Sequence, residues 1–175
     1  VESEVATSPA LSLFARPGDG RIQGRRVALL AAPAEDGRHL ATVRTALAAA
    51  RAVPRVLSTR LGTLPSSEAP PLAIESTVEA MPSALWDAVV VSAFAPTLSE
   101  LRRDGRITEF LRDQFRHGKP ILVLSDDIGT LDVLGLPPGP GMACVSTPDE
   151  ESIDCFIKTL ADHRAFGRES EPPAV

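Results

Sequence analysis

The sequence has 175 residues, enough for one domain with a full hydrophobic core, and 43% of them are hydrophobic. Its formal net charge of -5 is spread over interleaved acidic and Arg-rich patches, which argues against nucleic acid as the main partner. No run of about 18 apolar residues occurs, and the first residues lack the basic and apolar regions of a secretion signal. We therefore expect a globular protein that has no membrane partner.

The two cysteines, Cys144 and Cys155, match no zinc or redox spacing. We expect both to be small buried hydrophobic residues, and we expect no metal site. So few cysteines favour a cytoplasmic location. The chain begins with Val1 and not with Met, which is compatible with a fragment of a longer polypeptide.

The first half of the chain begins with a Pro- and Gly-rich segment, residues 1–24, that predicts a linker arm. Residues 25–32, RRVALLAA, predict a buried strand. The next segment, residues 36–52, has leucine and valine at helical spacing, and RVLS at 55–58 predicts a second strand. The Pro-rich residues 62–82 alternate only in LAIESTV, which indicates a short strand or hairpin.

Residues 87–93, DAVVVSA, predict another buried strand, and a helix is expected over residues 95–115. Thr97 and Glu100 have the spacing of a capping box at the start of that helix. Its apolar face is expected to contain Ile107, Phe110, Leu111 and Phe115.

The last elements are a strand at 119–124, a short helix over 126–136, a strand at 142–145 and a helix over 147–163. Thr147 and Glu150 predict a capping box for the final helix. The buried stripe of that helix is expected to be Ile153, Phe156, Ile157 and Leu160. Buried strands that alternate with amphipathic helices predict an α/β fold, a flavodoxin-like three-layer α/β/α sandwich with a mainly parallel sheet.

Polar residues follow three of the predicted strands, and the carboxyl ends of parallel strands meet at one edge of a sheet. The residues expected at this rim are Glu35, Asp36, His39, residues 92–96, Ser125, Asp126 and Asp127. The carboxylates there suit a cation or a basic segment better than an anion. His117 and His163 are expected on the surface at the opposite edge.

Several cofactor sites are excluded by their residue requirements. No Gly-rich phosphate loop follows the first strand, and the three prolines of GLPPGPG (135–141) remove the N–H donors that a phosphate cradle needs. Ser92 stands where a receiver domain needs a phosphoacceptor Asp. The sequence contains no tyrosine, so a tyrosinate ligand for haem is impossible.

Ser125 lies in a strand-to-helix turn, where it is either a nucleophile or a helix cap. A nucleophile on a sharp turn needs small neighbours two residues away, but Val123 and Asp127 stand there. His39 with Glu35 is the base pair that would serve Ser125 across the rim. We expect that no residue is catalytic and that Ser125 or Asp126 caps the following helix; Ser125, His39 and Glu35 remain the candidates for the alternative.

The order of four motifs resembles a known family. The motifs are SPALSLF with PGDGRIQGRRVALL, then DAVVVSA, HGKPILVLSDD and the ending DHRAFGR. Together they resemble the C-terminal domain of large-subunit haem catalases, from about residue 8 to 168. The resemblance implies a linker from a catalase core at 1–24, a flavodoxin-like domain at 25–168 and a tail at 169–175.

This domain is in turn similar to the class I glutamine amidotransferase-like superfamily. On that pattern Ser125 stands in place of the Cys nucleophile, Asp126 where a His often follows, and Glu35 near the Glu that faces the Cys. Both the thiol and the imidazole are missing, so the hydrolase activity of that superfamily does not carry over.

The resemblance implies a homotetrameric, cytoplasmic parent enzyme that converts hydrogen peroxide to water and oxygen with haem in another domain. No cofactor is expected in this fragment. Its expected role is accessory: it would contact the catalase core and sister subunits, stabilise the tetramer, influence access to the haem channel, or shield unfolded proteins. The alternative is a stand-alone amidotransferase-like hydrolase that uses Ser125.

Overall fold

A parallel six-stranded sheet forms the centre of the computed structural model, which describes residues 19–95 and 97–168. The strand order is β5-β2-β1-β6-β7-β8, and every neighbouring pair in it is parallel. The elements are β1 (Arg26–Ala31), α1 (Arg38–Ala49), β2 (Val53–Ser58), β3 (Gly62–Leu64), β4 (Leu72–Ile74), β5 (Ser76–Thr77), η3 (Ser83–Leu85), β6 (Ala88–Ser92), α2 (Leu98–Arg103), α3 (Gly105–Arg116), β7 (Ile121–Leu124), α4 (Thr130–Val133), β8 (Met142–Val145), α5 (Glu150–Ala161) and η4 (Phe166–Arg168).

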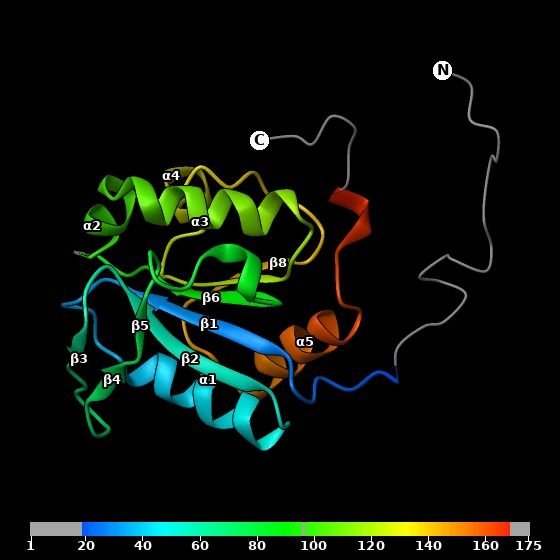
Figure 1. Cartoon of the computed structure of the whole chain (residues 1–175), viewed down its shortest axis with the longest axis horizontal. Helices are drawn as coiled ribbons and strands as arrows, with labels where there is room; N and C mark the ends of the chain where they lie inside the picture. Colours follow the sequence, from blue (N-terminus) through cyan, green and yellow to red (C-terminus); the bar gives the residue numbers. More distant parts are fainter. Residues whose placement is uncertain (1–18, 96, 169–175) are drawn as a thin grey trace.

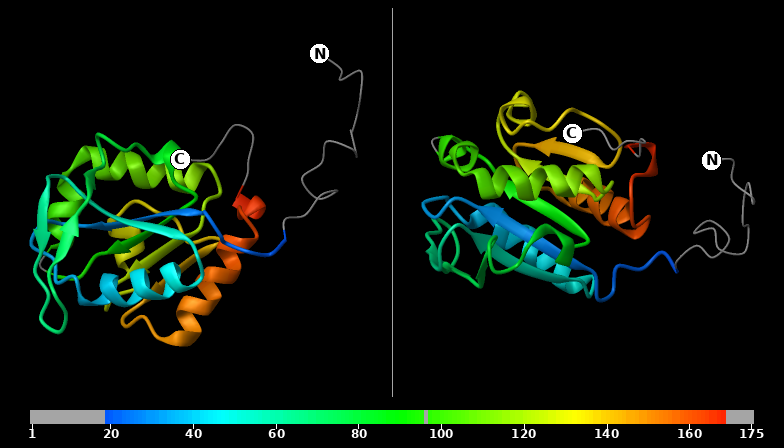
Figure 2. Two further views of the ribbon diagram at one scale, coloured as in Figure 1. Left: turned by 60° about the horizontal axis from the view of Figure 1, so that its bottom comes forward. Right: turned by 45° about the horizontal axis from the view of Figure 1, so that its top comes forward.

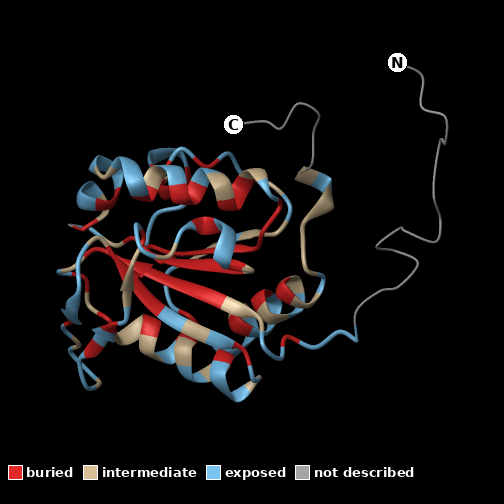
Figure 3. Cartoon of the chain, viewed as in Figure 1, coloured by how far each residue is buried: buried red, intermediate tan, exposed pale blue. Residues whose placement is uncertain are grey.

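Helices cover both faces of the sheet, α1 and α5 on one side and α2, α3 and α4 on the other (Figure 1; Figure 2). Strands that are covered on both faces need apolar side chains in both directions. The central strands β6 and β7 are buried at every position, and the buried residues gather in the sheet and on the inner helix faces (Figure 3). The three-layer α/β architecture expected from the sequence is therefore confirmed.

The strand order is consistent with the flavodoxin-like arrangement, in which the chain reverses direction across the sheet after its second core strand. The Pro-rich segment forms the expected hairpin, with β3 antiparallel to β4, and β5 then joins the sheet edge beside β2. None of the helices in residues 19–95 and 97–168 is both long and apolar enough to cross a membrane.

Two of the predicted helices differ in the structure. The helix expected over residues 95–115 is broken in two, because the Asp104 side chain accepts a hydrogen bond from the Arg106 amide and starts α3 anew. Thr97 is the N-cap residue of α2, as expected, but its side chain makes no capping hydrogen bond. The final helix begins later than expected, since Asp149 and Ser152 form its capping box in place of Thr147 and Glu150.

The expected apolar faces are present, since Ile107, Phe110, Leu111 and Phe115 are buried. On α5 only Ile157 of the predicted stripe is partly exposed. The expectation for the cysteines is wrong: Cys144 is only partly buried and Cys155 is exposed, because it lies on the outer side of α5. The predicted linker and tail fall mostly outside the described residues and remain predictions.

Candidate functional site

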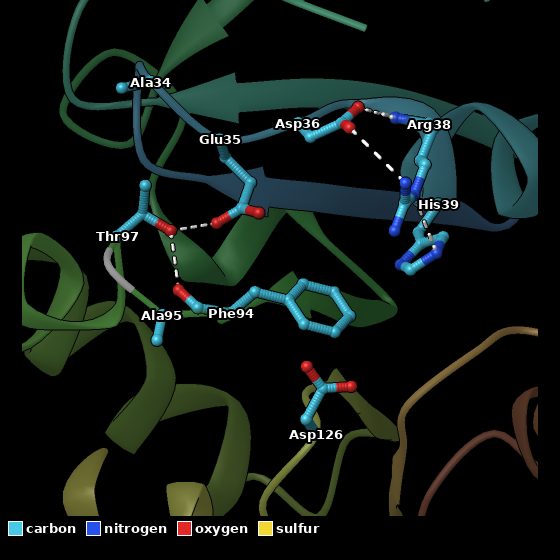
Figure 4. A pocket seen from close by; sticks show the side chains of 9 residues that line it. All are labelled: Ala34, Glu35, Asp36, Arg38, His39, Phe94, Ala95, Thr97 and Asp126. Atoms are coloured by element: carbon cyan, nitrogen blue, oxygen red, sulfur yellow. Dashed lines mark hydrogen bonds and ion pairs between the residues drawn. The ribbon is translucent and has the colours of Figure 1, made fainter. Parts of the chain in front are cut away.

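A crevice lies at the carboxyl edge of the sheet, at the point where the strand order reverses between β1 and β6. Open α/β sheets hold their ligands at this place, because the loops after the two strands diverge there. The cavity measures about 340 Å³, and we call it the switch-point crevice. Its lining consists of Ala34, Glu35, Asp36, Arg38, His39, Phe94, Ala95, Thr97 and Asp126 (Figure 4).

Among the charged residues of the lining, Glu35 is the most deeply buried, with only 4% of its surface exposed. The loop after β1 positions it, since the Glu35 amide donates to the Ala32 carbonyl at 3.0 Å. Its carboxyl group hydrogen-bonds to the hydroxyl of Thr97, which follows β6 (Figure 4). Burial raises the pKa of Glu35 above its usual range, although the Thr97 hydroxyl acts against this.

His39 lies in the first turn of α1 and faces the Phe94 ring, with the ring centroids 5.0 Å apart. Its Nε2 atom accepts a hydrogen bond from Arg38 Nε at 3.2 Å. A guanidinium can only donate, so the imidazole is neutral and carries its proton on Nδ1. Burial is the main cause of its lowered pKa, and the Arg38 charge adds to the effect.

Asp36 connects two segments by hydrogen bonds: the loop after β1, which contains Glu35, and the β3–β4 hairpin. Its carboxylate accepts hydrogen bonds from the Ser67 hydroxyl at 2.6 Å and from the Arg38 amide at 3.0 Å. The Ser67 hydrogen bond is the main reason that the pKa of Asp36 is lowered. Gly37 follows, and its amide donates to the Pro65 carbonyl at 2.7 Å. The hairpin therefore determines the shape of this rim of the crevice.

Ser125 does not join Glu35 and His39. Its side chain is buried, and its hydroxyl is 2.7 Å from the Thr130 hydroxyl and accepts from the Asp127 amide at 3.3 Å. It is absent from the crevice lining, whereas its neighbour Asp126 is part of it. The structure therefore does not assemble the nucleophile, base and carboxylate that the hydrolase alternative requires.

The capping expectation for Ser125 and Asp126 is also wrong. Helix α4 has Gly129 at its start and no side-chain cap. Asp127 instead accepts a hydrogen bond from the Gly129 amide at 2.8 Å, which closes a turn before the helix. Ser125 closes the preceding turn, since its hydroxyl accepts a hydrogen bond from the Asp127 amide. Both side chains thus stabilise turns and leave the helix uncapped.

The crevice gathers most of the residues expected at the rim: Glu35, Asp36, His39, Phe94, Ala95 and Asp126. Ser92, Ser125 and Asp127 were also expected there, but they are not part of its lining. Sequence reasoning assigned Thr97 to a helix cap and missed its bond to Glu35, which joins loops 62 residues apart. His117 is exposed as expected, but His163 is only partly exposed because it contacts Arg25 at the amino edge of the sheet.

The lining offers hydrogen-bond donors and acceptors but no activated nucleophile. Within the described residues, no group of three or more His, Cys, Asp or Glu side chains is arranged to hold a metal ion. The chain contains no tyrosine, so it cannot supply a tyrosinate ligand to a haem group. The arrangement is therefore suited to binding a small polar ligand.

Comparison with known proteins identifies the family. Residues 23–170 match a family model described as the C-terminal domain found in long catalases. The chain belongs to this family. A catalase HPII from Pseudomonas putida is 31% identical over 173 residues, which are 99% of this chain and 24% of that protein. Catalase C from Rhizobium meliloti is 27% identical over 93% of this chain and 23% of its own length.

A catalase HPII from Mycobacterium avium is 34% identical over 69% of this chain and 17% of its own length. The chain thus spans about a quarter or less of the length of the curated relatives that it matches. It is a C-terminal accessory domain of the large-catalase type, and the predicted resemblance is confirmed.

Proposed function

We propose that this chain is a non-catalytic accessory domain of a large catalase, in which haem bound in another domain converts hydrogen peroxide to water and oxygen. The observation that carries the proposal is the Ser125 hydroxyl, which is buried against Thr130 at the place where a hydrolase of this fold needs a free nucleophile. The relatives are catalases by name, which supports the parent activity.

The accessory role that we propose is stabilisation of the parent enzyme, a cytoplasmic homotetramer. This flavodoxin-like domain would contact the catalase core and the sister subunits. A chaperone-like action toward unfolded proteins under oxidative stress is part of the proposal. Exposed apolar side chains support it, since Ile128 is 70% and Leu61 67% exposed. Ile128→Ser should then weaken suppression of the heat-induced aggregation of a client protein such as citrate synthase, and unchanged suppression would contradict this part.

The decisive experiment is truncation of a full-length catalase that carries this chain, with the polypeptide ended before residue 19. We expect a lower inactivation temperature and partial loss of the tetramer by size-exclusion chromatography. An unchanged temperature and an unchanged assembly would refute the stabilising role.

Ser125→Ala in the full-length enzyme is the matched control for the hydrolase alternative. Peroxide turnover should stay the same, and a fluorophosphonate probe should label neither the wild type nor the variant at this position. Labelling that is lost in Ser125→Ala would revive the hydrolase.

A further inference from the structure

The switch-point crevice has an unbalanced charge. The Asp126 carboxylate is exposed at its mouth and forms no hydrogen bond or ion pair with any residue that the structure describes, and it lies across the cavity from the Phe94 ring (Figure 4). Arg38 supplies positive charge to the lining, but Asp36 at 3.9 Å and Glu68 at 3.5 Å already engage it. Asp126 is therefore a carboxylate without a counter-ion beside an open cavity.

The floor of the crevice holds the buried carboxyl group of Glu35. Thr97 Oγ1 is in hydrogen-bond contact with the Glu35 carboxyl and, at 2.9 Å, with the Phe94 carbonyl. The Thr97 hydroxyl is the donor in both contacts, so the Glu35 carboxyl group is an acceptor at this place. Burial raises the pKa of Glu35, and the hydrogen bond from Thr97 opposes this.

Ser92 adds an unsatisfied polar group behind Glu35. It ends β6 with 0% of its surface exposed, and its hydroxyl is close enough to the Glu35 carboxyl to lower the pKa of that group. This hydroxyl has no hydrogen-bond partner of normal geometry among the described residues. An orphan hydroxyl inside a protein is rare, and a ligand or water normally satisfies such a group.

Aromatic rings form the wall between floor and mouth. Phe94 and the neutral His39 face each other with their centroids 5.0 Å apart and their planes tilted by 59°. Aromatic faces attract cations through their quadrupole, and the attraction increases where water is excluded. The crevice therefore favours a positively charged ligand over a negative one, because Asp126 lies at its mouth, the Phe94 ring in its wall and Glu35 in its floor.

We infer that the switch-point crevice binds the ammonium group of an aliphatic amine, between Asp126 and the Phe94 ring and above the Glu35–Ser92 floor. A compact ammonium has three donors for these acceptors, whereas a bare metal ion would need a set of three close ligands. The ammonium belongs to a free amine or to a lysine side chain. This binding activity goes beyond the accessory role proposed above and does not depend on it.

Glu35 offers its carboxyl oxygens as acceptors for the ammonium group. The positive charge of the ligand favours the ionised form of this carboxyl group in the complex. A ligand that carries no charge lacks this attraction.

The first test is NMR titration of the full chain with n-butylamine at neutral pH, with n-butanol as the uncharged control. We expect saturable shifts of the Asp36, Phe94 and Asp126 amides with the amine alone. Asp126→Asn should weaken binding about threefold to fivefold. Asp154→Asn, the same change on the exposed side of α5, should leave affinity unchanged. Equal shifts with butanol, or unchanged affinity in Asp126→Asn, would overturn the inference.

The second test is calorimetry of n-butylamine binding to the wild type and to Glu35→Gln. Affinity should fall in Glu35→Gln, and an unchanged affinity would refute the role of Glu35. Nα-acetyl-lysine methylamide distinguishes the two sources. Tighter binding of this compound than of butylamine assigns the site to a protein segment, and weaker binding assigns it to a free amine.

Discussion

The two edges of the sheet use similar polar residues in different ways. At the amino edge, Asp87 accepts from the Arg26 amide at 2.7 Å and from Arg25 Nη1 at 3.3 Å, and Arg25 also donates to His163 Nδ1. At the carboxyl edge, Asp126 has no such partner among the described residues, and a cavity stands open beside it. The charged groups at the amino edge thus pair with one another, whereas the Asp126 carboxylate at the carboxyl edge is available to a ligand.

The segment after α5, residues 163–168, binds at the amino edge through these contacts. We call this segment the C-terminal strap. Its Ala165 amide donates to the Gly118 carbonyl at 2.7 Å, and the Arg168 guanidinium donates to the Lys119 carbonyl and lies over the Phe115 ring. Burial lowers the pKa of Arg168 to about 10, so it stays charged at neutral pH. The difference between the edges indicates that one end of the domain is built for attachment and the other for binding.

Gly141→Ala should have the largest effect, because it dislodges the strap. Gly141 has φ of +75°, and a Cβ there would lie 2.6 Å from the Ala165 Cβ. Backbone strain and overpacking together should lower the free energy of unfolding by about 2–4 kcal/mol, measured by urea denaturation. Gly135→Ala is the control, since its φ is +70° but no atom lies within 4 Å of the added carbon. Equal losses in both variants would show that the strap contact contributes nothing.

Gly37→Ala should have an intermediate effect at the carboxyl edge. An added Cβ would lie 3.2 to 3.3 Å from Leu64, Leu72 and the Pro65 carbonyl, where the hairpin meets the start of α1. We expect a loss of about 1 kcal/mol in the free energy of unfolding, with NMR shifts at Asp36. Gly105→Ala, at an open position, should cost nothing, and a loss there as large as at Gly37 would refute this explanation.

The layers of the fold could be predicted from sequence because periodicity reports burial directly. Buried strands read as continuous apolar runs, and the rule for parallel sheets then placed Glu35, His39 and Asp126 at one edge. The break between α2 and α3 also had a local signal, the Asp104–Gly105 pair, which the helical spacing of the flanking leucines concealed.

The contacts that decide what the polar groups do could not be predicted. Ser125 turns toward Thr130 and not toward the crevice, a rotamer choice that no spacing records. His163 meets Arg25 across 138 residues, and Thr97 meets Glu35 across 62. Such pairs depend on how the loops close after the layers have packed, so sequence indicates the edge but not the partner.

His163→Asn should remove a pH dependence from the amino edge. The Arg25 guanidinium can only donate hydrogen bonds, so His163 must be neutral to accept one. Burial is the main cause of the lowered pKa of His163. The positive charges of Arg25, Arg164 and Lys119 lower it further, and the Asp87 carboxylate opposes them. The lowered pKa means that this stability is complete above the ordinary value of 6.5 and is lost as the pH falls through the folded value.

Asparagine at position 163 keeps an acceptor oxygen near the place of Nδ1 and tolerates the φ of +73° found there. The protection of the Ala165 amide against hydrogen exchange, corrected for the intrinsic rate at each pH, should therefore decrease in acid in the wild type and much less in the variant. His117→Asn, at an exposed position, should exchange like the wild type. The same acid response in His163→Asn and the wild type would contradict the assignment.

Glu35→Gln should change stability least, and in the opposite direction with pH. Because burial raises the pKa of Glu35 above its ordinary value of 4.5, the folded chain holds a proton that the unfolded chain has lost. The free energy of unfolding of the wild type should therefore decrease as the pH rises from 4.5 through the folded pKa, and Glu35→Gln should not show this decrease. Urea denaturation in steps of pH measures both profiles, and parallel profiles would show that Glu35 is ionised in the folded state. Acid thus weakens the attachment of the strap while it stabilises the floor of the crevice, so the double variant His163→Asn/Glu35→Gln should lose both slopes additively.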